Sequence, residues 1–320
     1  MYKKSIILFI LIFLCVAAVM PFVGCSTVDD GRIKVVCTNF PTYDWVMNVL
    51  GERASEIEVT YLFKSGVDPH NYSYKSSDGL KIAKADLFIY VGGESDKWVP
   101  SALAAAENDS MRVINLMEVL GEDAKEEEAE GDEEEAEEEE EIEYDEHVWL
   151  SLRNAKRFVS RIAENMALLD PDYAETYAAN AATYVAALDT LDARYASTVE
   201  AAPRDTILVA DRFPFRYLTD DYAIKHFAAA NGCAAAVEPS PSVIMRLTQK
   251  VNELNIRVLL VIEKSDQRIA ETIRSESRDK DQDILVLDSL QSTTTEEYTE
   301  GRTYLSVMEN NLTVLERALA

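Results

Sequence analysis

The feature that most constrains the fold is a long helical pattern between residues 170 and 199 of this 320-residue chain. Its apolar side chains recur every three or four residues and therefore share one face of a helix: Tyr177, Ala181, Tyr184, Leu188, Leu191 and Tyr195. Asp170 is expected to cap this helix, with Pro171 in its first turn. At 1.5 Å per residue the helix would be roughly 40 Å long, about the depth of two small domains. The pattern predicts a rigid strut that joins two lobes.

Short apolar runs alternate with amphipathic stretches on both sides of the strut. Before it, strands are expected at 33–37, 57–63, 87–91 and 112–116; after it, at 206–210, 233–237, 258–262 and 284–287. This alternation of strand and helix is typical of parallel sheets covered by helices. We therefore expect an α/β protein with an N-terminal lobe (33–150), a helical segment (151–200) and a C-terminal lobe (201–320), each lobe a mainly parallel sheet flanked by helices.

The first 25 residues read as a targeting segment rather than as part of the fold. Lys3 and Lys4 precede an apolar run over 5–22, and Phe22-Val23-Gly24-Cys25 resembles a bacterial lipoprotein box. We expect a signal peptide over 1–25, lipidation of Cys25 and a short tether over 26–32. An uncleaved membrane anchor is the alternative, because about 18 apolar residues can just span a bilayer. Both interpretations place the folded part outside the cytoplasmic membrane.

The net charge of -27 is concentrated in one stretch. Residues 122–146 contain 18 acidic side chains and one lysine, so that the rest of the chain carries only about -10. Like charges repel and stay solvated, and we interpret the run as a surface loop that collects cations or merely links elements. With 31 basic against 58 acidic residues and no basic cluster beyond residue 4, the charge argues against nucleic-acid binding.

Two cysteines remain beyond the targeting segment, Cys37 and Cys233. An extracytoplasmic location permits a disulfide between them, and two free buried thiols are the alternative. No Cys-x-x-Cys spacing occurs, so the sequence does not predict a thiolate zinc site.

Polar residues cluster where the predicted strands end. His70 follows the second strand, and His147 ends the acidic run. In the C-terminal half, Asp211, Glu263 and Asp288 each follow a strand. Open α/β sheets bind ligands at the carboxyl ends of their strands. Two histidines from one lobe and carboxylates from the other could therefore close around a divalent cation in the cleft between the lobes.

Several short motifs together resemble one protein family. They are Asp68-Pro69-His70, His147-Val148-Trp149-Leu150-Ser151, Phe215-Arg216-Tyr217-Leu218 and Glu238-Pro239-Ser240-Pro241. With the strut helix, they resemble the zinc and manganese receptors of bacterial ABC transporters, also called metal-binding lipoprotein adhesins. The resemblance extends over about residues 33–319. An acidic loop just before the second metal histidine is typical of the zinc branch of that family, although the histidines common in such loops are absent here.

The resemblance implies a set of metal ligands. His70 and His147 would be the first and second, and Asp288 would be the fourth. The chain departs from the family at the third position, where Arg212 stands in place of histidine or glutamate; a guanidinium has no lone pair for a metal. We expect the neighbouring Asp211 to serve instead, with Glu238 and Glu263 as substitutes. The remaining histidine, His226, lies in no motif and is expected at the surface.

The resemblance also implies a function. We expect a monomeric, lipid-anchored receptor on the outer face of the bacterial cell membrane that binds zinc and delivers it to an ABC permease, without catalysis. Manganese or iron could replace zinc as the cargo. A metal-dependent hydrolase is a competing hypothesis, for which Glu146 beside His147 is the one suggestive residue. An adhesive surface lipoprotein with a degenerate metal site is another. Trp149 and Phe215 are expected to wall the site.

Overall fold

The computed structural model describes residues 31–127, 143–233 and 239–320, and Ile33–Ala320 forms one compact unit. The expected signal peptide, Cys25 and most of the tether lie outside the described residues, as does the middle of the acidic run. None of the helices within the described ranges is both long and apolar enough to cross a membrane.

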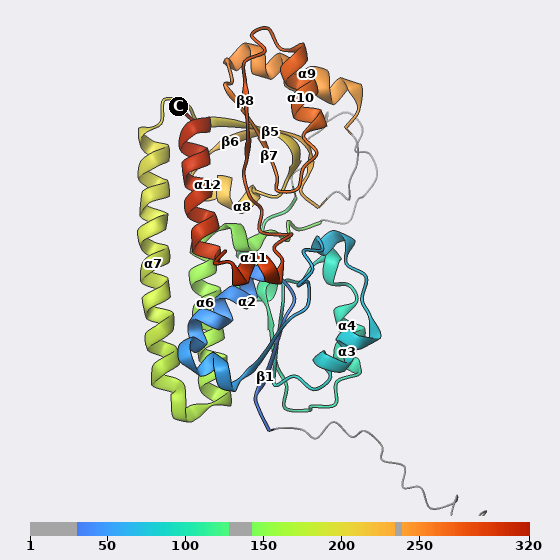
Figure 1. Cartoon of the computed structure of the whole chain (residues 1–320), viewed down its shortest axis with the longest axis vertical. Helices are drawn as coiled ribbons and strands as arrows, with labels where there is room; N and C mark the ends of the chain where they lie inside the picture. Colours follow the sequence, from blue (N-terminus) through green and yellow to red (C-terminus); the bar gives the residue numbers. More distant parts are fainter. Residues whose placement is uncertain (1–30, 128–142, 234–238) are drawn as a thin grey trace, which may run out of the picture. The chain divides into compact units, whose positions relative to one another are not determined.

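The first half of the unit forms a four-stranded parallel sheet in the order β2-β1-β3-β4. Its strands are β1 (Lys34–Cys37), β2 (Glu58–Tyr61), β3 (Leu87–Tyr90) and β4 (Arg112–Asn115). The helices α2 (Phe40–Leu50), α3 (Ser76–Ile82) and α4 (Val99–Ala104) lie between them, and α5 (Leu116–Leu120) follows β4. The central strands β1 and β3 are almost fully buried, as expected for parallel strands covered on both faces (Figure 1).

The second half repeats this topology in the order β6-β5-β7-β8, again with every pairing parallel. Its strands are β5 (Thr206–Phe213), β6 (Lys225–Asn231), β7 (Val258–Val261) and β8 (Asp283–Val286). The helices are α8 (Arg216–Asp221), α9 (Pro241–Leu254), α10 (Arg268–Glu276) and α11 (Thr295–Thr299). The predicted fold class of two parallel sheets flanked by helices is confirmed.

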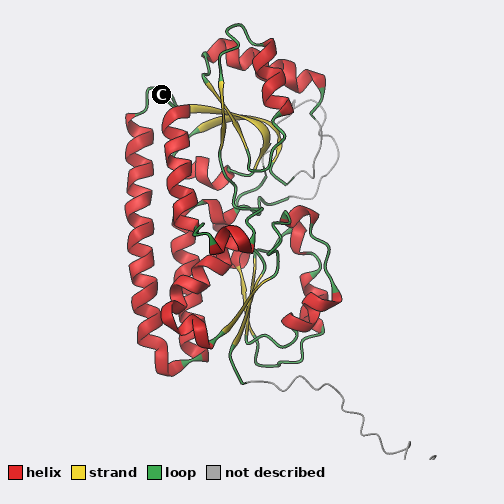
Figure 2. Ribbon diagram, viewed as in Figure 1, coloured by secondary structure: helices red, strands yellow, loops and turns green. Residues whose placement is uncertain are grey.

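A layer of three long helices connects the two halves: α6 (Leu152–Leu169), α7 (Ala174–Ala201) and α12 (Tyr304–Ala318) (Figure 2). At 28 residues α7 is about 42 Å long, and the predicted apolar stripe is its buried face. The closing helix α12 contacts α2 and α7 as well as β7. The C-terminal segment therefore packs against an element of the first half as well as of the second. The lobe boundaries at 33–150 and 201–320 stay a prediction.

Two local expectations were wrong. Asp170 does not cap the strut, because its carboxylate accepts hydrogen bonds from the Tyr177 hydroxyl (2.7 Å) and Arg53 Nε (3.0 Å) instead. The strand β6 lies at Lys225–Asn231, where His226 was expected at the surface, whereas residues 234–237 of the strand expected at 233–237 lie outside the described residues. His226 therefore lies half-buried in a strand rather than on an exposed surface. Its ring stacks on Phe213 at 3.7 Å, and burial lowers its pKa to about 4.

A buried carboxylate joins α2 to the long helices α7 and α12. Asp44 of α2 accepts hydrogen bonds from the Tyr184 hydroxyl of α7 (3.0 Å) and the backbone N–H of Tyr304 at the start of α12 (3.3 Å). Burial raises the pKa of Asp44 to about 6, and these two hydrogen bonds oppose the shift. The charged form is thus held inside the protein by its donors.

Tyr184→Phe should lower the free energy of unfolding by about 1–3 kcal/mol at pH 7.5, because it leaves a buried carboxylate with one donor fewer. Since the pKa of Asp44 is raised by folding, its proton stabilises the folded state below about pH 6 and is lost as pH rises through that value. The loss should therefore be smaller at pH 5 than at pH 7.5. Urea unfolding at both pH values measures it.

The matched control is Tyr173→Phe, the same change at a ring that is 37% exposed. It should shift stability by no more than about 0.5 kcal/mol. An equal loss in both variants, or a Tyr184→Phe loss independent of pH, would contradict the role given to Asp44.

Candidate metal centre

His70 is placed by a short helical turn after β2. Asp68 caps the turn η2 (Pro69–Asn71), and its carboxylate accepts the backbone N–H of His70 at 3.0 Å. The proline at the first position of the turn fixes the backbone angle there. The His70 side chain is only 6% exposed. The motif Asp68-Pro69-His70 therefore fixes the position of the His70 imidazole.

His147 is held still more firmly where the acidic run ends. The two sides of the run pair as antiparallel backbone, with Asp145 N–H donating to the Lys125 carbonyl at 2.9 Å. Asp145 Oδ1 then accepts both the backbone N–H of His147 (2.7 Å) and its ring Nδ1 (2.9 Å). His147 is fully buried, and the turn that follows leads into α6, capped by Ser151. The expected surface loop is thus anchored at its described ends.

The two imidazoles meet through their Nε2 atoms, which lie 3.1 Å apart. His70 Nδ1 lies 2.8 Å from Ser95 Oγ, so each ring has a polar partner behind it. Without a cation, the protonated Nε2 of His147 donates to the Nε2 lone pair of His70, whose Nδ1–H donates to Ser95 Oγ. With a cation, both protons sit on Nδ1, where Ser95 Oγ and Asp145 accept them, and both Nε2 lone pairs face the ion. Partners of this kind orient metal-binding histidines.

The pKa values of the two histidines are shifted in opposite directions. Burial, followed by the neighbouring His147, lowers the pKa of His70 to about 3. Burial also disfavours the charged form of His147, but the Asp145 carboxylate outweighs it and holds the pKa of His147 well above the usual value. His70 is therefore neutral at physiological pH, as a ligand must be. To serve as a ligand, His147 would have to give up a proton.

Cys233 is the third member of this cluster, and sequence reasoning missed it as a ligand. One ring nitrogen of each histidine and Cys233 Sγ all lie within 4.8 Å of one another. Within the described ranges, this is the one group of three or more potential ligands that meets such a limit. Both Cys37 and Cys233 are free thiols here, so they are not paired with each other. The signal was the strand end: Cys233 follows β6 by two residues once that strand is placed correctly.

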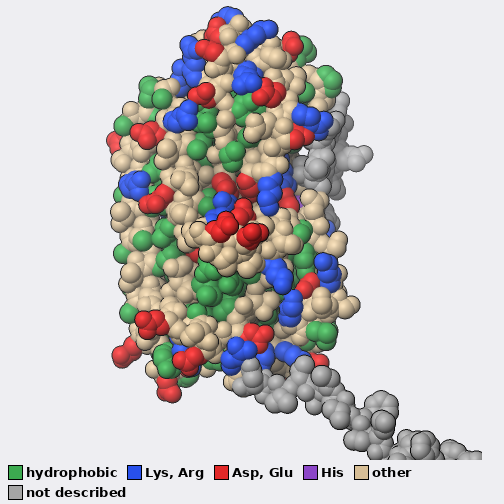
Figure 3. Space-filling view, viewed as in Figure 1, with side chains coloured by type: hydrophobic (Ala, Val, Ile, Leu, Met, Phe, Trp, Pro, Cys, Tyr) green, Lys and Arg blue, Asp and Glu red, His purple; other side chains and the backbone are tan. Residues whose placement is uncertain are grey.

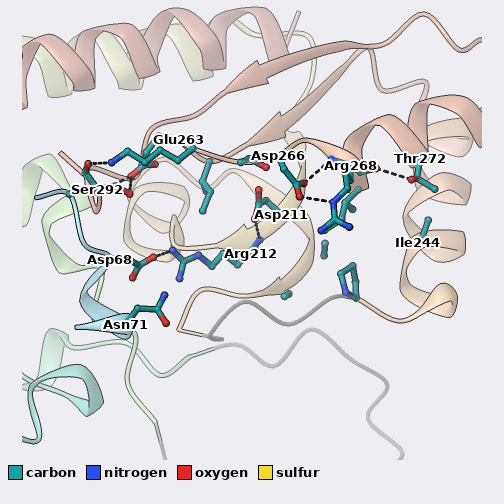
Figure 4. Close-up of a pocket in the computed structure, with 18 residues that line it drawn as sticks. Asp68, Asn71, Asp211, Arg212, Ile244, Glu263, Asp266, Arg268, Thr272 and Ser292 are labelled. Atoms are coloured by element: carbon teal, nitrogen blue, oxygen red, sulfur yellow. Dashed lines mark hydrogen bonds and ion pairs between the residues drawn. The ribbon is translucent and has the colours of Figure 1, made fainter. Parts of the chain in front are cut away.

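The structure does not bring Asp211 and Asp288 into this cluster, and their roles as ligands stay predictions. Asp288 accepts Arg302 Nη2 (2.6 Å) and the Leu290 N–H (2.9 Å) through its two oxygens. Asp211 accepts the N–H of Arg212 at 2.9 Å and a hydrogen bond from Ser265, and burial raises its pKa. It lines a cavity of about 650 Å³ beside Arg212 (Figure 4).

Of the two carboxylates expected as substitutes for Asp211, only Glu263 lies within the described residues. Glu263 also lines the cavity, but it accepts the backbone N–H groups of Ser289 (2.8 Å) and Gln291 (3.0 Å) and thereby fixes that loop. Burial, and then the charge of Asp288, raise its pKa. Glu238 lies outside the described residues. Glu263 is therefore hydrogen-bonded to the loop after β8 and is not part of the cluster with the histidines.

Arg212 crosses to the turn that carries His70. Its guanidinium forms an ion pair with Asp68 (Figure 4) and a hydrogen bond with Gln291 Oε1 at 3.1 Å. The two charged side chains are only 13% and 15% exposed. Asp68 holds the backbone of His70 with its other oxygen. Arg212, which departs from the family pattern, therefore supports His70 from β5 of the second sheet.

Glu146 lies beside the histidines, with its Oε2 3.9 Å from His70 Nδ1. Its Oε1 accepts the Ser95 N–H at 2.8 Å, and burial raises its pKa. A Cβ at Gly93 would come within 2.5 Å of that oxygen, and Gly93 has a φ of +83°. Only glycine fits this position. Glu146 thus fixes the loop that presents Ser95 to His70. Trp149 and Phe215 are buried, as expected of walls, and Trp149 Nε1 donates to the Ser289 carbonyl at 2.9 Å.

Arg212→Ala should lower the free energy of unfolding by about 3 kcal/mol, because it leaves Asp68 buried without its cation. The same change should weaken divalent-metal binding by about 10- to 100-fold, as expected for loss of a residue that supports a ligand. Urea unfolding and metal titration measure the two effects.

The control is Arg257→Ala, which removes an ion pair with Asp281 in which both side chains are 57% exposed. It should cost less than about 1 kcal/mol and leave metal binding unchanged. Wild-type metal affinity in Arg212→Ala would remove Arg212 from the support of His70.

Sequence comparison relates the chain to proteins whose names refer to zinc binding or zinc uptake. The family model described as ZnuA, zinc-uptake complex component A, periplasmic, matches residues 35–318. The high-affinity zinc uptake system protein ZnuA of Bacillus subtilis is 32% identical over 329 aligned residues, covering 100% of this chain and 99% of that protein. The zinc-binding lipoprotein AdcA of Streptococcus pneumoniae R6 is 32% identical over 297 residues. That match covers 92% of this chain but 58% of AdcA, so the chain spans about three fifths of these longer relatives.

Solved structures share the fold. The metal-dependent lipoprotein YcdH of Bacillus subtilis aligns with a TM-score of 0.74 at 28% identity, covering 90% of this chain and 100% of YcdH. The zinc-bound ZnuA-like domain of Streptococcus pneumoniae AdcA aligns with a TM-score of 0.70 at 29% identity, covering 90% of this chain and 99% of that domain. The zinc-binding protein TroA of Treponema pallidum, at 20% identity and a TM-score of 0.72, shows the fold alone.

Proposed function

The chain belongs to the family of periplasmic zinc-uptake components, and from this premise we propose that it captures zinc outside the cytoplasmic membrane and delivers it to an ABC permease. The observation that carries the proposal is the convergence of His70 Nε2 and His147 Nε2 at 3.1 Å, each ring held from behind by a polar partner. Neutral imidazole nitrogens are preferred zinc ligands. The relatives named for zinc binding and zinc uptake support zinc as the cargo.

The proposed role is binding without chemistry. A metal-dependent hydrolase needs a general base beside a metal-bound water. Glu146, the residue next to His147, instead accepts the Ser95 amide in a buried position. On the face that Figure 3 shows, acidic and basic side chains are interspersed, an arrangement that does not favour nucleic-acid binding.

We extend the proposal to the location and assembly of the protein. The lipoprotein box that ends at Cys25 would tether a monomer to the outer face of the membrane, with lobes at 33–150 and 201–320 on either side of the site. The name of AdcA, a zinc-binding lipoprotein, supports the anchor. Asp211 and Asp288 stay candidate carboxylate ligands that would have to leave their present partners to bind the cargo.

His70→Ala and His147→Ala should each abolish one-to-one zinc binding by the chelator-treated protein, because each removes one of the two converging nitrogens. Isothermal titration calorimetry measures the stoichiometry. His226→Gln, which changes the one histidine outside the site, should bind zinc as the wild type does. Absence of stoichiometric zinc binding by the wild type would overturn the proposed function, and retained binding in either alanine variant would remove that histidine from the site.

Zinc affinity should fall as the pH is lowered from 7.5 to 5.5, because an imidazolium has no lone pair and protons compete with the metal. The Asp145 carboxylate raises the pKa of His147, so this ring carries the proton that zinc displaces. We expect roughly a tenfold loss of affinity for each competing proton and pH unit. Calorimetry in buffers of different ionisation enthalpy counts the protons released; an affinity independent of pH would contradict binding through His147.

A further inference from the structure

The third protein ligand is the open question in this site, because Arg212 stands where the family pattern has a ligand. The guanidinium is paired with Asp68 and Gln291 and cannot coordinate a cation. Asp211 and Asp288 are hydrogen-bonded away from the histidines. A different donor must complete a site for zinc, which takes four ligands in a tetrahedron.

Cys233 lies where that donor is needed. Its Sγ and one nitrogen of each histidine fall within 4.8 Å of one another. Tetrahedral zinc with bonds of about 2.1 Å to nitrogen and about 2.3 Å to sulfur separates its ligand atoms by roughly 3.5 Å. The thiol also forms a hydrogen bond with the His147 ring. Small side-chain movements would therefore place all three atoms around one ion.

The backbone of Cys233 is fixed from the same side as His147. Its N–H donates to Glu127 Oε1 at 2.8 Å, and Glu127 belongs to the strand segment that pairs with Glu143 just before Asp145. The described ends of the acidic run thus hold two members of the cluster, His147 through Asp145 and Cys233 through Glu127. A cysteine held this way is placed for ligation rather than for core packing, since its side chain is half-buried and faces polar groups.

We propose that Cys233 Sγ is the third protein ligand of the metal site, together with His70 and His147, and that this thiolate selects zinc over manganese. The inference rests on the proposed function and names the chemistry of its cargo. On binding, the Cys233 S–H bond breaks, the sulfur electron pair forms the bond to Zn²⁺, and the proton passes to solvent. Thiolate is a soft ligand that suits zinc, whereas manganese prefers oxygen donors.

Cobalt(II) provides a direct test, because a thiolate bound to this metal gives an intense charge-transfer absorption in the near ultraviolet. The full chain purified in detergent should bind one cobalt ion and show this band. Cys233→Ser should lose the band and bind zinc more than about 100-fold more weakly, a larger loss than the roughly 10- to 100-fold typical of residues that only support a ligand. Its preference for zinc over manganese should shrink in parallel.

The control is Cys37→Ser, which alters the fully buried thiol of β1 and should keep the band. A second readout needs no variant: alkylation followed by peptide mass spectrometry should show that zinc protects Cys233. One-to-one zinc binding without the cobalt band and without this protection would overturn Cys233 as a ligand while the proposed function stands. No zinc binding by the wild type would overturn both.

Discussion

The metal centre depends on holding two imidazole nitrogens close together and facing each other. His70 Nε2 and His147 Nε2 are 3.1 Å apart, and two lone pairs at that distance repel unless a proton or a cation lies between them. Ser95 and Asp145 hold the far sides of the rings, so neither ring is free to turn away. Their positions depend in turn on Glu146, Gly93 and the paired ends of the acidic run. The site is therefore preorganised for an ion by a network of hydrogen bonds behind the two rings.

The two sheets share one strand order, and this explains why the site lies where it does. In parallel sheets the loops at the carboxyl ends of the strands gather ligands. His70 comes from such a loop of the first sheet and Cys233 from one of the second. Contacts between the halves hold these loops: Arg212 pairs with Asp68 before His70, and the Cys233 N–H donates to Glu127 Oε1 at 2.8 Å. The long helix α7 provides the common support.

Periodicity was enough to predict the fold class and the strut, because these depend on local pattern, and the strand-end rule predicted that His70 and His147 lie close together. The strand β6 was not expected at Lys225–Asn231, because spacing alone does not distinguish its alanines at 228–230 from the similar run of alanines at 234–236. That error hid Cys233, since the strand-end rule was applied at the wrong residue. The partners of Asp170, Asp211 and Asp288 depend on long-range packing, which one sequence does not specify. Asp170 accepts a hydrogen bond from Arg53, Asp211 from Ser265 and Asp288 from Arg302, and each donor comes from elsewhere along the chain.

Arg212 fits a cation site only because Asp68 neutralises it. An unpaired guanidinium close to the histidines would repel a divalent cation, and the low dielectric of a buried site would strengthen that repulsion. Paired with Asp68, it contributes no net charge and at the same time fixes the turn that presents His70. The charge that balances the metal must then come from another anion. The Cys233 thiolate supplies it beside the two rings, so the loss of a ligand at position 212 and the presence of a cysteine at 233 are two parts of one electrostatic arrangement.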